Sequence, residues 1–344
     1  MAGHSLPSTF ESLRRGLSAP LPRTSPSIPM GACSSAFTHP SALIVMIRSA
    51  AGRHYSQICP RRAWGWLSTP RALSGRRVAH FRKDRATSGE WLRTARFDYV
   101  QHHFSQDHRA NLWPLPDGVD RMDVVLDGAA EIGFADIDGL HRYAEASPVL
   151  FGDVFHLFEH IVAYNLPQGS HTLVDREVDG IPNGPDRLYR LHLHLNGGSG
   201  VGFRPWLSEW ARQLTSASAV RKLRLHLPEA YDNAHPSPPS PHGDHQVSDE
   251  RKDIGVIEIG FANALTARAF CESEAYRVTI DDQRRYLRSV GAFLVTGVYT
   301  YVRDGVITTA GLRGSRTAEL IERIGAVNQT REEVTRHFVQ GPHQ

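Results

Sequence analysis

The sequence predicts an α+β fold in which one βαββαβ unit occurs twice. The first observation is a repeated pentapeptide, EIGFA, at Glu131–Ala135 and again at Glu258–Ala262. The second is that segments with strand and helix periodicity follow the same order around each copy. The third is that residues 1–60, which are rich in Ser, Pro and Arg, lack both periodicities. The repeat therefore predicts two structural units behind a leader.

The second unit shows the clearer pattern. Aromatic and aliphatic residues recur at helical spacing in Phe203–Leu214, and residues 264–289 form a second helical region. The four segments that are typical of strands are Arg187–Leu195, Val220–Leu227, Ile254–Phe261 and Gly291–Val302. The predicted order is βαββαβ.

The first unit follows the same order with weaker signals. Its expected strands are Ala63–Ser68, Phe97–Phe104, Asp127–Phe134 and Phe158–Leu166. Its expected helices are Leu73–Leu92 and Ile137–Ser147. A βαββαβ unit is a ferredoxin-like layer, whose right-handed crossovers give the strand order 4-1-3-2 with both helices on one face. The bare face of the sheet must be covered, so two tandem ferredoxin-like units are expected to form an intrachain, dimeric-type α/β barrel.

The expected organisation has five parts. Residues 1–60 are nearly free of acidic residues, which is typical of a transit peptide. They could equally be an over-long translation start before Met46, and their removal is expected to change stability little. The parts are a disordered leader or targeting segment (1–60), the first repeat (61–170), a linker (171–186), the second repeat (187–312) and a helical extension (313–344).

Composition argues against several functional classes. Residues 1–97 carry fifteen basic and three acidic residues, but the basic ones are scattered, so nucleic-acid binding is not expected. No apolar run approaches the roughly 20 residues of a membrane span. The three cysteines lie far apart and predict neither a disulfide framework nor a metal site, which favours a reducing, cytoplasmic location.

Polar residues on the expected strands are the candidate site. Alternation puts leucines on one face of the second unit and polar residues on the other. In the order 4-1-3-2 the polar side chains form one band: His192, His194, Arg224, His226 and Glu258. In the first unit Glu131 takes the place of Glu258. Either His102 or His103 takes the place of His226, because a register change of one residue reverses the face.

The band allows three interpretations. Glu258 could be buried only to pair with Arg and His neighbours. Alternatively, a desolvated Glu–His–Arg cluster could act as acid and base. Finally, His192 and His194 with His226 and Glu258 could form a His₃Glu metal site, although no other zinc or iron signature is present. Tyr164 and Tyr299 fall at similar places in the two last strands and are expected to be core aromatics with bonded hydroxyls.

The first unit also carries a set of short features shared with a known family. They are Tyr99, Asp127–Gly128, Glu131, Phe134, Ser147–Pro148 and Asp153–Phe155. In these features residues 65–310 resemble the EthD family of dimeric α/β-barrel proteins. The second unit keeps Glu258 and Phe261 but lacks the Ser-Pro pair. The resemblance implies the barrel fold and an association with oxidative degradation of small organic compounds; fungal relatives act near polyketide aromatics, sometimes as decarboxylases.

No nucleotide-binding or hydrolase motif accompanies this pattern. The sequence has no GxGxxG after a strand, no P-loop, no GxSxG and no HExxH, so neither a nicotinamide nor a flavin cofactor is supported. The leading hypothesis is a cofactor-independent enzyme of oxidoreductase type that acts on a small hydrophobic or aromatic compound, as a monomer with an internal pseudo-dimer. The rivals are a decarboxylase or cyclase that uses the same band, and a non-catalytic carrier of a hydrophobic molecule.

Overall fold

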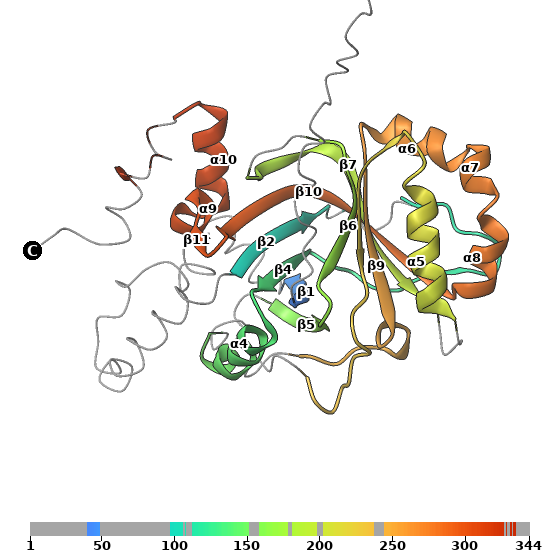
Figure 1. Ribbon diagram of the computed structural model, residues 1–344, viewed down its shortest axis with the longest axis horizontal. Helices are drawn as coiled ribbons and strands as arrows, with labels where there is room; N and C mark the ends of the chain where they lie inside the picture. Colours follow the sequence, from blue (N-terminus) through green and yellow to red (C-terminus); the bar gives the residue numbers. More distant parts are fainter. Residues whose placement is uncertain are drawn as a thin grey trace, which may run out of the picture. The chain divides into compact units, whose positions relative to one another are not determined.

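The computed structural model describes residues 40–48, 97–105, 107, 112–150, 158–177, 181–197, 202–236, 244–326, 328, 331 and 333–334. All of them belong to one compact unit, Ala36–Gln344. The unit is α+β and is built on a curled sheet (Figure 1). No helix among the described residues is long and apolar enough to cross a membrane.

The sheet has eleven strands. They are β1 (Ser41–Arg48), β2 (Phe97–Phe104), β3 (Asp120–Arg121), β4 (Gly128–Phe134), β5 (Phe158–Leu166), β6 (Ser170–Asp175), β7 (Asn183–Asn196), β8 (Val220–His226), β9 (Ile254–Phe261), β10 (Ser289–Arg303) and β11 (Val306–Ile307). The order across the sheet is β5-β1-β4-β2-β10-β7-β9-β8-β6, with β3 and β11 paired to β10. All neighbours on the main path are antiparallel.

Seven described α-helices accompany the sheet. They are α4 (Ile137–Leu150), α5 (Phe203–Leu214), α6 (Ala264–Cys271), α7 (Glu274–Arg277), α8 (Ile280–Tyr286), α9 (Thr309–Arg313) and α10 (Ser315–Arg323), and a 3₁₀ turn, η2 (Asp249–Arg251), precedes β9. In Figure 1, α5 to α8 lie together on one side of β9, and α9 and α10 lie beside β10. The helix α10 falls within the expected C-terminal helical extension, residues 313–344, of which 313–326, 328, 331 and 333–334 are described.

Strand order and register relate the two halves of the sheet. Numbered in chain order, β1, β2, β4 and β5 lie in the order 4-1-3-2, and so do β7, β8, β9 and β10. Glu131 stands opposite Val100 on the neighbouring strand, as Glu258 stands opposite Arg224. The two glutamates therefore hold corresponding places in their halves, and the long strand β10 joins the halves by pairing with both β2 and β7.

The first strand is not where the sequence pattern placed it. The expected strand Ala63–Ser68 and helix Leu73–Leu92 lie outside the described residues, and Ser41–Arg48 lies between β4 and β5 instead. The expectation that residues 1–60 form a separate leader is therefore wrong for β1, where Ala42 is fully buried. A chain beginning at Met46 would lack most of this strand. A strand between two others, if covered on both faces, is a continuous apolar run without alternation, so periodicity does not reveal it.

The expected linker, residues 171–186, is also largely sheet. Most of β6 and the first residues of β7 fall within it. The elements of the second half agree closely with the expected ones, and α5 and β9 have the expected bounds. The expected helical region 264–289 is divided into α6, α7 and α8.

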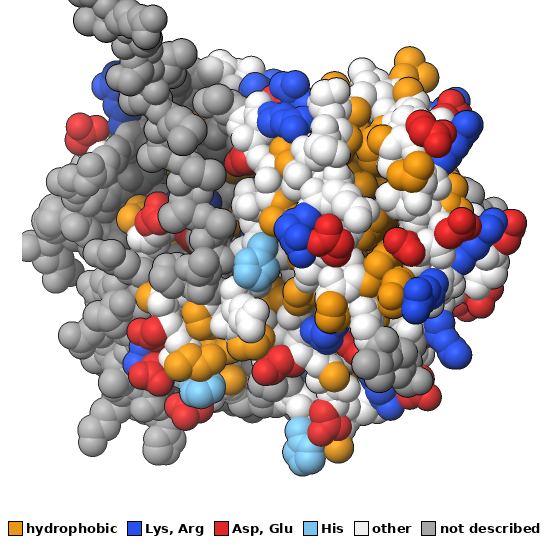
Figure 2. Space-filling view, turned by 45° about the vertical axis from the view of Figure 1, so that its right-hand side comes forward, with side chains coloured by type: hydrophobic (Ala, Val, Ile, Leu, Met, Phe, Trp, Pro, Cys, Tyr) orange, Lys and Arg blue, Asp and Glu red, His pale blue; other side chains and the backbone are white. Residues whose placement is uncertain are grey.

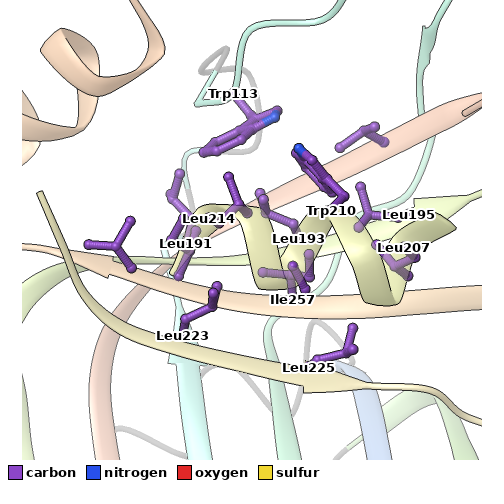
Figure 3. Packing of buried hydrophobic residues seen from close by; sticks show 14 of the residues in the cluster. Trp113, Leu191, Leu193, Leu195, Leu207, Trp210, Leu214, Leu223, Leu225 and Ile257 are labelled. Atoms are coloured by element: carbon purple, nitrogen blue, oxygen red, sulfur yellow. The ribbon is translucent and has the colours of Figure 1, made fainter. Parts of the chain in front are cut away.

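The apolar face of the second half packs against α5. Leu191, Leu193 and Leu195 of β7 lie in one buried cluster with Leu207 and Trp210 of α5. Figure 3 shows these side chains between the helix and the strands. Because successive strand residues point to opposite faces, this packing directs the residues between the leucines to the other side of the sheet.

Candidate functional site

The face of the sheet opposite α5 carries buried ionisable side chains. Glu258 of β9 stands directly opposite His192 of β7 and Arg224 of β8. His192 has no exposed surface and Glu258 is 2% exposed, while the Arg224 side chain is 18% exposed. On the outer surface, by contrast, basic and acidic side chains are interspersed, as Figure 2 shows for one face. The interior therefore holds a separate, water-poor set of charges.

Arg224 binds the two corresponding glutamates at once. Its Nη1 lies 2.7 Å from Glu131 Oε2 and its Nη2 lies 2.9 Å from Glu131 Oε1, which is a bidentate pair. The same Nη1 lies 2.9 Å from Glu258 Oε1. One guanidinium thus connects β4, in the first half of the sheet, to β8 and β9 in the second.

Ser170 and His226 close these contacts into a ring. His226 Nε2 lies 2.9 Å from Glu258 Oε1, and His226 Nδ1 lies 2.7 Å from Ser170 Oγ. The Ser170 hydroxyl donates to Glu131 Oε1. We call Glu131, Ser170, Arg224, His226 and Glu258 the glutamate ring. If Ser170 donates to Glu131, both His226 contacts require a ring N–H.

A pair of histidines lies beside the glutamate ring. His192 Nδ1 and His194 Nε2 are 3.0 Å apart, so one ring donates to the other. The other nitrogens, His192 Nε2 and His194 Nδ1, are buried and have no hydrogen-bond partner in the described part of the chain. Glu258 Oε2 likewise accepts no hydrogen bond there, although His102 Nδ1 lies 3.9 Å away and Arg190 Nη1 lies 3.7 Å away. These three atoms, His192 Nε2, His194 Nδ1 and Glu258 Oε2, are available to hydrogen-bond another molecule.

Burial and charge shift the pKa values of this site in different directions. Burial alone would raise the pKa of Glu258, but His102, Arg224 and His226 lower it, and the net pKa is well below the usual range. For Glu131, Arg224 and His226 likewise outweigh burial and lower the pKa. Burial lowers the pKa of His192 and of His194 far below the usual histidine value. At neutral pH the site therefore combines the ionised carboxylates of Glu131 and Glu258 with the neutral imidazoles of His192 and His194.

The register decides between the two histidines of β2. His102 stands opposite Ala129, two residues before Glu131, as His226 stands opposite Val256, two residues before Glu258. His102 is 4% exposed and faces Glu258. His103 does not join the site, because the alternation of the strand turns it to the other face, where its ring lies 4.7 Å from that of Tyr299.

The expected tyrosines have bonded hydroxyls but do not correspond to each other. The Tyr164 hydroxyl donates to the Arg251 carbonyl at 2.9 Å, and the Tyr299 hydroxyl donates to Glu319 at 3.2 Å. Tyr164 of β5 stands opposite Leu43 of β1, and Leu43 in turn stands opposite Glu131. In the second half, Phe293 of β10 stands opposite His192 of β7, which in turn stands opposite Glu258. Phe293, not Tyr299, is therefore the counterpart of Tyr164.

The sequence pattern missed three contributors. Ser170 lies at the first residue of β6, which had no recognisable strand pattern. Arg190 Nε lies 2.7 Å from Asp186 Oδ2, a residue that had been assigned to the linker. Arg251 is buried at the end of η2. Of the three, only Arg190 had a signal in the sequence, because it occupies a polar position in an alternating strand.

Among the described residues two groups could hold a metal ion, but neither is the His₃Glu set that the sequence allowed as one interpretation. His102, His192 and Glu258 bring ligand atoms within 4.8 Å of one another, and so do Glu131, His226 and Glu258. His194 belongs to neither group. Arg224 and Arg190 already place two positive charges beside Glu258, and a dication there would be repelled by both. The charges therefore disfavour cation binding at this carboxylate.

The pKa shifts predict a stability that falls in mild acid. Because the pKa of each of His192 and His194 is lowered on folding, the unfolded chain binds more protons below its own pKa of about 6.5. Stability is thus complete above about pH 6.5 and is lost as the pH falls toward the folded-state values. Urea unfolding between pH 8 and pH 5 should show this loss, and replacing both histidines with Gln should flatten it. A wild-type midpoint independent of pH over this range would contradict the burial of neutral imidazoles.

Comparison with known proteins gives distant structural similarity. The chain matches no family profile and no curated protein sequence. An anthrone oxidase-like protein is 10% identical, with 76% of this chain and 93% of that chain covered and a TM-score of 0.43. A candidate monooxygenase from Fusobacterium nucleatum is 5% identical, covering 77% and 94%, with a TM-score of 0.42. A chlorite dismutase variant from Candidatus Nitrospira defluvii is 11% identical, covering 76% and 92%, with a TM-score of 0.36. These neighbours have folds of the dimeric α/β-barrel type.

Proposed function

We propose that the chain is a tandem EthD-like protein whose two ferredoxin-like units form one barrel. The strand order 4-1-3-2 in both halves supports this, as does the match of GAAEIGF (Gly128–Phe134) with GVIEIGF (Gly255–Phe261). The segment after β8, the last strand but one in the order, also contacts β5 at the opposite end, since Glu229 donates its N–H to Asn165 O at 2.9 Å. A barrel complete within one chain needs no partner copy, so light scattering should give a monomer.

The enzyme hypothesis is carried by one observation. Glu258 Oε2, His192 Nε2 and His194 Nδ1 are buried and lack hydrogen-bond partners in the described residues, although the other carboxylate oxygen of Glu258 is bound within the glutamate ring. A group placed only for structure would be expected to satisfy these atoms as well. We infer that they contact a substrate, and that the protein is a cofactor-independent enzyme of oxidoreductase type for a small hydrophobic or aromatic compound.

Within this proposal His192, and not Glu258, receives the proton. The pKa values of Glu258 and His192 are both held well below their usual ranges, but only Glu258 is also bound by Arg224 and His226, which hold its negative charge in place. His192 is neutral and has an unbonded Nε2, and His194 fixes the orientation of the ring through the bond to Nδ1. Once His192 is protonated, the negative charge of Glu258 directly across the strand pair stabilises it.

The reaction we propose uses molecular oxygen as the oxidant. His192 removes a proton from an activated CH₂ group of an electron-rich aromatic, which leaves a carbanion. The carbanion gives its electron pair to O₂, and the proton returns, so that a hydroperoxide forms. Loss of water from the hydroperoxide gives the ketone, so that one O₂ is consumed and one water is released for each CH₂ oxidised. The EthD resemblance of the sequence supports this reaction class over decarboxylation or cyclisation.

The test begins with mass spectrometry of small molecules that co-purify with the protein. Oxygen uptake is then measured with the compound found and with related aromatics. His192→Gln should lower the rate by about 10²–10⁴, the usual contribution of general acid–base catalysis. His103→Gln, on the same sheet but facing away from the site, is the matched control and should keep the rate. A compound that binds but is never converted would indicate a carrier, and an active His192→Gln would exclude His192 as the base.

A further inference from the structure

Arg251 is a buried arginine that the glutamate ring does not use. It ends η2 and is 3% exposed. Its backbone is fixed on both sides, because its N–H donates to Ser248 O at 2.9 Å and its carbonyl accepts from the Tyr164 hydroxyl at 2.9 Å. The position of the side chain is therefore set by the fold.

Among the described residues, the guanidinium of Arg251 has no counter-ion. Its Nε and Nη2 are buried and have no hydrogen-bond partner, and no carboxylate of the described chain lies within ion-pair distance of it. Arg190, which is buried, and Arg224, which is partly buried, differ, since Arg190 pairs with Asp186 and Arg224 binds Glu131 and Glu258. A buried charge without a partner is strongly unfavourable. Something outside the described residues is expected to neutralise it.

The groups around Arg251 suit an aromatic anion. Four titratable groups feel its charge: His160, His194, Tyr164 and Tyr231. The nearest carboxylate among the partners of these groups, Asp244, is already bonded to His160 at 3.3 Å. His194 offers its unbonded Nδ1. Tyr164 and Tyr231 belong to one buried apolar cluster with Phe293, whose ring packs edge-on against His194.

We propose that Arg251 and His194 bind the carboxylate of a small aromatic acid, with its ring against Tyr164, Tyr231 and Phe293. Guanidinium and carboxylate match as planar, bidentate partners. The site itself depends only on Arg251 and its surroundings. The further statement that this anion is the substrate, held with its reacting carbon toward His192, rests on the proposed function. His194 then connects His192 to the anion, because its Nε2 hydrogen-bonds His192 and its Nδ1 contacts the anion.

The test compares charged and neutral ligands of the same shape. Melting of the full chain is followed with benzoate, with benzamide and with sodium phosphate. Benzoate should raise Tm by about 2 °C or more, while benzamide and phosphate should leave it unchanged. Equal shifts with benzoate and benzamide would overturn the anion site, and an equal shift with phosphate would overturn the aromatic part.

Variants of Arg251 give a second, independent measurement. Arg251→Met removes the unpaired charge, so the ligand-free Tm should rise while the benzoate shift disappears. Arg204→Met is the matched control, because Arg204 is partly exposed and pairs with Asp253 at 2.6 Å, and it should keep the benzoate shift. A lower ligand-free Tm in Arg251→Met together with an unchanged benzoate shift would refute the proposal. Benzoate binding without oxygen uptake would keep the anion site and contradict only the proposed function.

Discussion

Replacing Arg224 with Met is expected to lower the free energy of unfolding by about 3–5 kcal/mol. The substitution leaves Glu131 and Glu258 buried without the guanidinium that both now bind at 2.7–2.9 Å. Removing one partner of a buried pair costs far more than the pair itself contributes, because the remaining charge has lost its water and its counter-ion. Urea unfolding at pH 7.5 measures the loss.

The matched control for this substitution lies on the same strand. Arg221→Met removes a contact with Glu177 in which both side chains are at least a third exposed, and should change stability by no more than about 1 kcal/mol. Adding Glu131→Gln and Glu258→Gln to Arg224→Met should recover much of the loss, since no charge is then left unpaired. Equal losses for Arg221→Met and Arg224→Met would show that the glutamate ring is not buried as described.

The second large effect is expected for Glu258→Gln. Gln keeps the volume and removes the charge that stabilises a protonated His192, so turnover should fall by about 10²–10⁴. Arg224 and His226 also lose a carboxylate partner, so stability should fall with it. Activity and urea unfolding are measured on the same preparation.

Glu131→Gln distinguishes the structural from the catalytic contribution. Glu131 binds Arg224 as Glu258 does, but in the register Leu43 stands opposite it where His192 stands opposite Glu258. A similar stability loss with a smaller loss of turnover is therefore expected. If the two Gln variants lose activity in proportion to stability alone, the ring serves only to hold the sheet together. If Glu258→Gln keeps both, its assigned face is wrong.

Alternation was sufficient to predict the second half of the site. In β7, β8 and β9 one face is apolar and packs on α5. The sequence alone therefore places the polar residues of these strands together on the other face: His192, His194, Arg224, His226 and Glu258. The repeated EIGFA pentapeptide also gave the correspondence of Glu131 with Glu258. What alternation could not give is that the two glutamates bind one guanidinium, because that contact joins strands far apart in the chain.

The elements that sequence analysis missed have physical reasons of their own. The apolar run of β1 stands between two strands and carries no period-two signal, so it was assigned to the leader. Ser170 follows the sharp turn at Gly169, whose φ is +68°. It begins the short strand β6, which lies at one end of the strand order and pairs with β8. Arg251 and Ser170 are single polar residues outside any pattern. Their role comes entirely from tertiary contacts.

The position of β10 has a consequence for how the chain is made. This strand, Ser289–Arg303, is the link between β2 and β7 in the strand order, and it is among the last elements to be synthesised. Until it emerges from the ribosome, β2 has a free edge, and unpaired strand edges promote association between chains. Pairing β2 with β10 joins residues almost two hundred positions apart, as in the register of Val298 with His102, and such distant contacts slow folding. Nascent chains that stop before β10 are therefore expected to need chaperone protection until synthesis is complete.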